Sequence, residues 1–201
     1  PIIEPSHSGL DDKSIRGFSP MIDEKGYLVA EGKNYIGYYF AFSYGAPEAR
    51  IFRTVSNGRD RVSWGDGELV LDHGSNGEWD ETTVATGNVI KLGENDYIMV
   101  YVGKKYNEYG IGIATSQDGI NWNKYENNPV LVENQFVGSS GQDVIVISIP
   151  YMIKLSNGNF VLGLEGIDSV GGNNYEIFFA ESSDGFNWEP INDGNPSLVP
   201  E

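Results

Sequence analysis

Two stretches of the chain, IATSQDGINW (residues 113–122) and FAESSDGFNW (residues 179–188), repeat one pattern. In both, a run of alternating residues leads into Ser-x-Asp-Gly, and a tryptophan stands three residues after the glycine. The Asp-Gly pair favours a tight turn, and the alternation before it favours a strand. The pattern therefore predicts a β-hairpin that the chain uses more than once, which indicates a repeat architecture.

Outward from these hairpins, three longer units become visible. They open with residues 1–22, 68–90 and 129–153, and each places an aspartate ten residues before an isoleucine, namely Asp12, Asp80 and Asp143. A strand-like run follows in each unit, then a third strand and the hairpin, which ends at Trp64, Trp122 or Trp188. Each unit is thus predicted to be a meander of about four short strands, the size of one blade of a β-propeller. We predict an all-β propeller of four-stranded blades in one domain, with repeats at about residues 1–67, 68–128 and 129–201.

Composition and charge exclude several classes of partner. Thirteen Lys and Arg against 29 Asp and Glu give a net charge of −16, which repels a nucleic acid and an anionic membrane surface. The chain has no cysteine, so it has neither disulfides nor thiolate metal sites. Because no stretch is apolar enough to span a bilayer, we expect a soluble protein, extracellular or on a virion surface rather than cytoplasmic. The chain opens at Pro1 without a methionine, and we expect it to be processed, excised or incomplete.

The units resemble the blades of the five-bladed propeller glycosidases, the superfamily of arabinanases, β-xylosidases, invertases and levanases. Two motifs carry the resemblance, the A-x-S-x-D-G-x-x-W hairpin and the opening strand WDETTVATGNVI at residues 79–90. The resemblance implies a glycan or oligosaccharide as partner. It also implies that three of five blades are present, so that further blades or a second chain are needed to close the propeller.

Glycoside hydrolysis usually needs two carboxyl groups, one on each side of the scissile bond. In the resembled superfamily these acids lie on the innermost strands of successive blades. The matching positions here are uncharged: Ser19 in SPMI, Asn88 in TGNVI and Ser148 in SIPYMI. The resemblance therefore implies a carbohydrate-recognising domain that has lost hydrolytic machinery, although a register slip of one residue would reverse which side chains face the site.

The remaining acidic residues leave two interpretations open. The repeated Asp12, Asp80 and Asp143 either bind backbone N–H groups in turns or converge around the axis, where they would bind a sugar hydroxyl or a calcium ion. No other cofactor or metal is expected. If the protein is instead an active glycosidase on a polysaccharide, Asp12 or Asp23 would be the base and Glu165 the acid. Glu165 interrupts an apolar strand, and burial there would raise its pKa.

Aromatic and polar residues complete the predicted ligand site. Tyr39, Tyr101 and Trp79 could present flat faces to sugar rings beside Asn88, or they could belong to the core. His7 and His73 are expected to be loop residues without a metal. A third class, a structural or virion-surface adhesion module, also stays compatible with the acidic, cysteine-free sequence.

Overall fold

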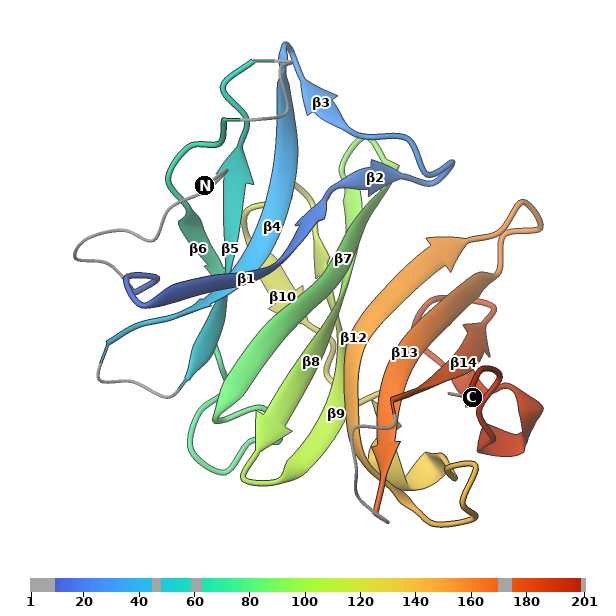
Figure 1. The fold of residues 1–201 in the computed structure, drawn as a ribbon. Coiled ribbons are helices and arrows are strands. Elements are labelled where there is room, and N and C mark those ends of the chain that lie inside the picture. The colour runs from blue at the N-terminus through green and yellow to red at the C-terminus, as the bar shows by residue number, and fades with distance from the viewer. Residues whose placement is uncertain (1–9, 45–47, 59–62, 170–174, 200–201) are drawn as a thin grey trace.

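The structure is a computed structural model that describes residues 10–44, 48–58, 63–169 and 175–199. Three antiparallel sheets follow one another around a common axis (Figure 1). The first contains β1 (Ser14–Pro20), β4 (Asn34–Phe42), β5 (Ala49–Val55) and β6 (Glu68–Leu71) in that order, with β3 (Ala30–Glu31) beside β4. The second contains β7 (Thr83–Gly93), β8 (Asp96–Lys105), β9 (Glu108–Ser116) and β10 (Trp122–Lys124). The third contains β12 (Val144–Lys154), β13 (Phe160–Asp168), β14 (Glu176–Ser182) and β15 (Glu189–Pro190).

Each sheet is a meander, and its first strand lies innermost. The inner strand β7 of the second sheet contacts both β1 and β12. The helices in the described part of the chain are two short 3₁₀ turns, η1 (Glu133–Gln135) and η2 (Asn192–Gly194). None of these described helices is long and apolar enough to cross a membrane. The predicted fold class, an all-β propeller with three meander blades in this chain, is confirmed, and the three sheets do not close a ring.

Three short segments show where one blade ends and the next begins. The strand β6 pairs with β5, and β11 (Leu131–Val132) pairs with β9, so both belong to the blade that precedes them in sequence. Leu198 forms a bridge with Ile177 at the matching place in the third blade. The sheets therefore divide the chain a few residues later than the sequence boundaries. Between the first two blades, β2 (Ile22–Asp23) pairs in parallel with β7 and joins their inner strands by backbone hydrogen bonds.

The repeated hairpin has the same hydrogen bonds in both intact copies. The Ser116 hydroxyl accepts the N–H of Gly119 at 2.8 Å, as the Ser182 hydroxyl accepts that of Gly185 at 2.9 Å. Both glycines have positive φ, 72° and 84°, a backbone conformation that side chains disfavour. An aspartate stands between the serine and the glycine of each hairpin, Asp118 in one and Asp184 in the other. Its carboxylate accepts hydrogen bonds from the asparagine three residues later, and these bonds hold the pKa of each carboxyl well below its usual range.

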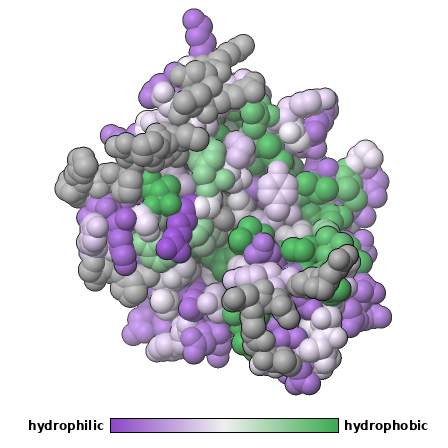
Figure 2. Space-filling model, viewed as in Figure 1, coloured by the Kyte–Doolittle hydropathy of each residue, from purple (hydrophilic) through white to green (hydrophobic). Residues whose placement is uncertain are grey.

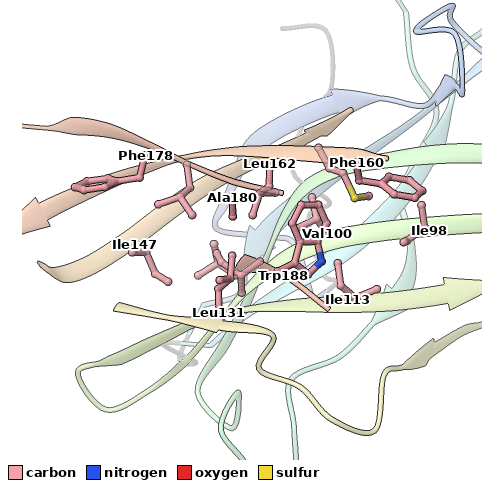
Figure 3. Close-up of a cluster of buried hydrophobic side chains, with 14 of the residues drawn as sticks. Ile98, Val100, Ile113, Leu131, Ile147, Phe160, Leu162, Phe178, Ala180 and Trp188 are labelled. Atoms are coloured by element: carbon pink, nitrogen blue, oxygen red, sulfur yellow. The ribbon is translucent and has the colours of Figure 1, made fainter. Parts of the chain in front are cut away.

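Apolar residues from facing blades form the core. The cluster between the second and third blades includes Val100, Ile113, Leu131, Phe160 and Trp188 (Figure 3). A second cluster lies between the first and second blades. Trp188 is 6% exposed, as expected for a tryptophan packed between sheets, whereas Trp64 and Trp122 are half-buried.

The outer face of the third blade is also apolar. Tyr151 and Ile153 alternate with the buried Met152 and are 49% and 41% exposed. Figure 2 shows hydrophobic residues gathered over β12 and β13. That further blades or a second chain cover this face stays a prediction.

Candidate functional site at the propeller axis

Each inner strand carries a β-bulge at the same level of the propeller. The pairing register shifts between Arg16 and Ser19 in β1, between Thr86 and Asn88 in β7, and between Ser148 and Tyr151 in β12. Bulges of this kind bend a strand and redirect its side chains, and they are frequent beside active sites. The three bulges bring irregular backbone together around the axis.

The backbone at two of these bulges explains the local sequence. A Cβ added to Gly87 would lie 2.1 Å from the carbonyl oxygen of Pro150, so only glycine lets β7 approach β12 here. Ile149, beside that proline, has a φ of 47°, which is strained for a β-branched residue. It is 65% exposed. Backbone strain of this kind is typical of functional sites, so Ile149 indicates a candidate site at this end of the axis.

A cavity of about 630 Å³ opens where the inner strands begin. This volume falls in the usual range for small-molecule sites. Aromatic rings form much of its wall: Phe40 and Phe42 from β4, and Tyr109 from β9. Ser148 and Ile149 contribute the edge that belongs to the third blade. The cavity thus takes residues from all three sheets.

The charged residues of this axial cavity are basic. Arg16 and Lys104 line it, and no aspartate or glutamate does among the described residues. The Arg16 guanidinium lies 5.5 Å from the centroid of the Phe42 ring, and the Lys104 Nζ lies 4.8 Å from that of Tyr109. Both distances permit cation–π attraction. In the part of the chain that the structure describes, neither cation has a carboxylate oxygen within 4.0 Å.

The model of the glycosyl hydrolases family 32 N-terminal domain matches residues 20–193. The chain belongs to this family. The resemblance to five-bladed propeller glycosidases that the sequence indicates is thereby confirmed. No curated protein matches the family 32 chain.

Solved structures share the fold of this family 32 chain at low sequence identity. Fructan 1-exohydrolase IIa from Cichorium intybus in complex with 1-kestose is 19% identical, with a TM-score of 0.64 over 89% of this chain and 32% of that one. A β-fructofuranosidase from Bombyx mori in complex with sucrose is 17% identical, with a TM-score of 0.60 over 89% of this chain and 34% of that one. Inulosucrase from Halalkalicoccus jeotgali bound to kestose is 18% identical, with a TM-score of 0.63 over 99% of this chain and 57% of that one. The family 32 chain thus spans about a third of the length of the first two proteins.

The three positions predicted to replace catalytic acids lie in different surroundings. Ser148 lines the axial cavity. Ser19 is 8% exposed. Asn88 is fully buried, and its amide donates to the carbonyl oxygen of Met152 at 2.9 Å and accepts the N–H of Met152 at 2.8 Å. Asn88 therefore ties β7 to β12, and this placement does not favour contact with a ligand.

The bulges also change which residues are equivalent. The second strands of the blades align at Tyr35, Tyr97 and Phe160, which puts Tyr38, Val100 and Gly163 at one level. Their partners on the inner strands are Ser19, Asn88 and Tyr151. The structural equivalent of Ser19 and Asn88 in this family 32 chain is thus Tyr151, three residues beyond the sequence assignment to Ser148. The sequence spacing agrees with this register for the last two blades, because Asn88 and Tyr151 each stand two residues before the isoleucine of the repeated Asp-to-Ile spacing.

The structure does not bring Asp12, Asp80 and Asp143 together. Asp12 accepts the N–H of Tyr44 at 2.7 Å. Asp80 is 1% exposed and forms an ion pair with Lys124 at 2.7 Å, and Asp143 is exposed. Among the described residues, no group of three or more His, Asp or Glu could hold a metal ion. The predicted convergence of these three acids on a sugar or a calcium ion is not seen.

The predicted aromatic ligands Tyr39 and Tyr101 are core residues of the family 32 domain. Both are fully buried, and their hydroxyls donate to Asp11 at 2.7 Å and to Asp80 at 3.3 Å. Burial, and secondarily the neighbouring carboxylate, raises the pKa of both phenols. Trp79 is half-buried against Tyr101, with ring centroids 5.7 Å apart, and lines a smaller cavity of about 260 Å³. Only Trp79 of these three rings therefore borders open space in the described structure.

The two candidate bases of the predicted hydrolytic pair, Asp12 and Asp23, lie at opposite ends of β1, and neither lines the axial cavity. Asp23 accepts the N–H groups of Lys25 at 2.9 Å and Tyr27 at 2.8 Å, which makes it a turn residue. Glu165 pairs across the sheet with Ser148 and is half-buried on the outer face of the third blade.

Sequence reasoning missed the two basic residues of the axial cavity. Arg16 and Lys104 come from different blades, and neither belongs to a motif. The one signal near Arg16 is the adjacent Gly17, which interrupts a strand pattern and has a φ of 59° at the bulge. Of the two histidines, His73 contacts Arg50 at 3.1 Å, and His7 lies outside the described residues.

Proposed function

We propose that this family 32 domain recognises carbohydrate in its axial cavity and does not itself supply the carboxyl pair for glycoside hydrolysis. Membership in a glycosyl hydrolase family supports a carbohydrate ligand. Two structural relatives were solved as complexes with 1-kestose and with sucrose, which also supports a carbohydrate ligand. Proteins that share one fold can differ in their chemistry, so the residues that line the cavity decide what this domain can do.

The lining of the axial cavity carries the proposal. Hydrolysis of a glycosidic bond takes two carboxyl groups about 5 to 10 Å apart, one to protonate the leaving oxygen and one to act as base or nucleophile. The described residues that line this cavity include no carboxylate. Loss of general acid–base help alone lowers the rate about 10² to 10⁴-fold.

Binding needs no proton transfer, and the cavity has groups suited to it. The rings of Phe40, Phe42 and Tyr109 offer apolar faces to the C–H side of a sugar ring. The hydroxyls of Ser148, Thr82 and Thr83 can donate and accept hydrogen bonds with sugar hydroxyls.

Affinity gels containing inulin, levan, arabinan or xylan test the proposal, with release of reducing sugar measured in parallel. We expect retardation on at least one glycan and no release. Tyr109→Ala should weaken the retardation about tenfold through loss of ring contact. Tyr27→Ala, at a 70% exposed turn residue outside the cavity, is the matched control and should leave it unchanged. Absence of retardation on every glycan would favour the structural or adhesion class instead.

One observation supports a second function, an active glycosidase on a polysaccharide. Glu165 lies directly across the sheet from Ser148, one strand away from the cavity edge. A carboxyl there could serve as the acid if a bound glycan extended over the third blade. Release of reducing sugar that Glu165→Gln abolishes would establish this alternative and overturn the binding-only proposal.

A further inference from the structure

Two cations without carboxylate partners border the axial cavity of a strongly acidic protein. The chain has 29 Asp and Glu for 13 Lys and Arg. Among the described residues, Arg50, Arg53, Lys105, Lys124 and Lys154 have a carboxylate within 4.0 Å, whereas Lys13, Arg16, Lys25, Lys33, Lys91 and Lys104 have none. Of the cations without a carboxylate partner, Arg16 and Lys104 line the axial cavity, and each lies over an aromatic ring there.

The contrast is sharpest between neighbours on one strand. Lys105 points away from the cavity, where its Nζ donates to the carbonyl oxygen of Gly77 at 2.9 Å and lies 4.0 Å from Glu81. Lys104, one residue earlier and on the opposite face of β8, lines the cavity above Tyr109. Strand alternation therefore separates a neutralised lysine from one whose charge faces the cavity.

From this arrangement we propose that the axial cavity selects sugars that carry an anionic group, a carboxylate, sulfate or phosphate, which Arg16 and Lys104 bind. The planar guanidinium of Arg16 can form two parallel hydrogen bonds with such a group, and Lys104 adds a point charge. The aromatic wall then contacts the sugar ring. This inference rests on the proposed function and narrows its substrate class.

The negative net charge of the protein opposes binding of an anionic sugar. A chain of net charge −16 repels anions at long range, so tighter binding of an anionic sugar than of its neutral parent requires local cations at the site. The ring contacts are the same for both sugars and cancel in the comparison. Any preference therefore reports the charged part of the cavity.

Four probes that share one ring and differ only at carbon 6 separate the possible anions: glucose, glucuronate, glucose 6-sulfate and glucose 6-phosphate. Dissociation constants are measured by ligand-observed NMR titration of the full chain at low ionic strength, with inorganic sulfate and phosphate alongside. We expect at least one anionic sugar to bind about tenfold more tightly than glucose, as one charge-assisted hydrogen bond allows. It should also bind more tightly than the matching inorganic anion.

Charge-removing variants locate the effect. Arg16→Gln and Lys104→Gln should each weaken binding of the anionic sugar more than binding of glucose, so that most of the preference is lost. Lys91→Gln is the matched control, because Lys91 also lies over a ring, 5.2 Å from the centroid of Tyr97, but outside the cavity lining. Arg16→Lys and Lys104→Arg retain the charge and should retain the preference, which keeps the test valid if a glutamine variant is unstable.

The outcomes separate this inference from the function on which it rests. Binding of glucose or neutral fructan with no anion preference overturns the inference and leaves the proposed function standing. Equal binding of inorganic phosphate and glucose 6-phosphate also overturns it, because the sugar then contributes nothing. Failure of every sugar, neutral or anionic, removes both proposals.

Discussion

Replacing Asn88 by aspartate should make the hydrogen-bonded contact between the second and third blades depend on pH. In the native protein the fully buried amide donates to the carbonyl oxygen of Met152 at 2.9 Å and accepts its N–H at 2.8 Å. Asn88→Asp keeps the shape and the acceptor. However, it puts an oxygen against the carbonyl oxygen of Met152, where the native residue has an N–H donor.

The magnitude follows from those two bonds. A buried carbonyl that loses its donor costs about 1 to 3 kcal/mol, and burying a carboxylate without a cation adds to this cost. We expect Asn88→Asp to lower the free energy of unfolding by about 3 to 5 kcal/mol at pH 7. When protonated, the new acid can donate to Met152 as the amide does, and the loss should shrink to about 1 kcal/mol.

The direction of the pH effect is fixed by linkage. Because the folded state favours the neutral acid, the pKa of the new carboxyl is raised above its unfolded value of about 3.9. The penalty is therefore fully present above the raised folded pKa and disappears as the pH falls below the unfolded pKa. The difference between variant and native protein must be taken at each pH, because other groups also titrate.

Urea unfolding at pH 7 and near pH 4 is the assay. Asn88→Ala is the control, since it loses both bonds without introducing a charge and should cost about 2 to 4 kcal/mol at either pH. If Asn88→Asp were indistinguishable from Asn88→Ala at both pH values, the carboxylate would not be buried against Met152. A cost below about 0.5 kcal/mol for Asn88→Ala would show that the tie does not stabilise the packing of the two blades.

Three further outcomes are expected. Trp188→Phe should cost more stability in thermal unfolding than Trp122→Phe, and equal losses would contradict this. The Trp188 indole donates to the carbonyl oxygen of Gly185 at 3.0 Å, whereas the buried Trp122 N–H has no hydrogen-bond partner among the described residues. NMR titration should give Asp118 and Asp184 pKa values below the ordinary aspartate value of about 3.9, and ordinary midpoints would refute this. The stability from their hydrogen bonds should be fully present above the unfolded pKa and should be lost as the pH falls from there through the lower folded pKa. Light scattering should detect association through the exposed apolar face of β12, and a monomer at all concentrations would argue against it.

The fold could be predicted from sequence because its signals are local. An Asp-Gly turn, the serine before it and the tryptophan after it lie within a few residues, and the same hydrogen bonds form in both intact hairpins. The alternation of apolar residues then gives the strands.

The site could not be predicted in the same way, because its geometry depends on contacts between blades. The strand pairing makes Tyr151, and not Ser148, the counterpart of Asn88, because Tyr151 pairs with Gly163 as Asn88 pairs with Val100. Arg16 and Lys104 line one cavity although 87 residues stand between them, and no local sequence pattern indicates that they lie close together.

The parallel pairing of β2 with β7 has a consequence for how the protein unfolds. Repeat proteins in which each unit contacts its neighbour only through side chains can lose their units one at a time. Here, Ile22 and Asp23 pair along β7 with Ile90 and Lys91, so opening the first blade breaks backbone hydrogen bonds of the second. The first two blades should exchange their amide hydrogens as one cooperative unit, whereas the third, joined by side-chain contacts and the Asn88 amide, can open separately.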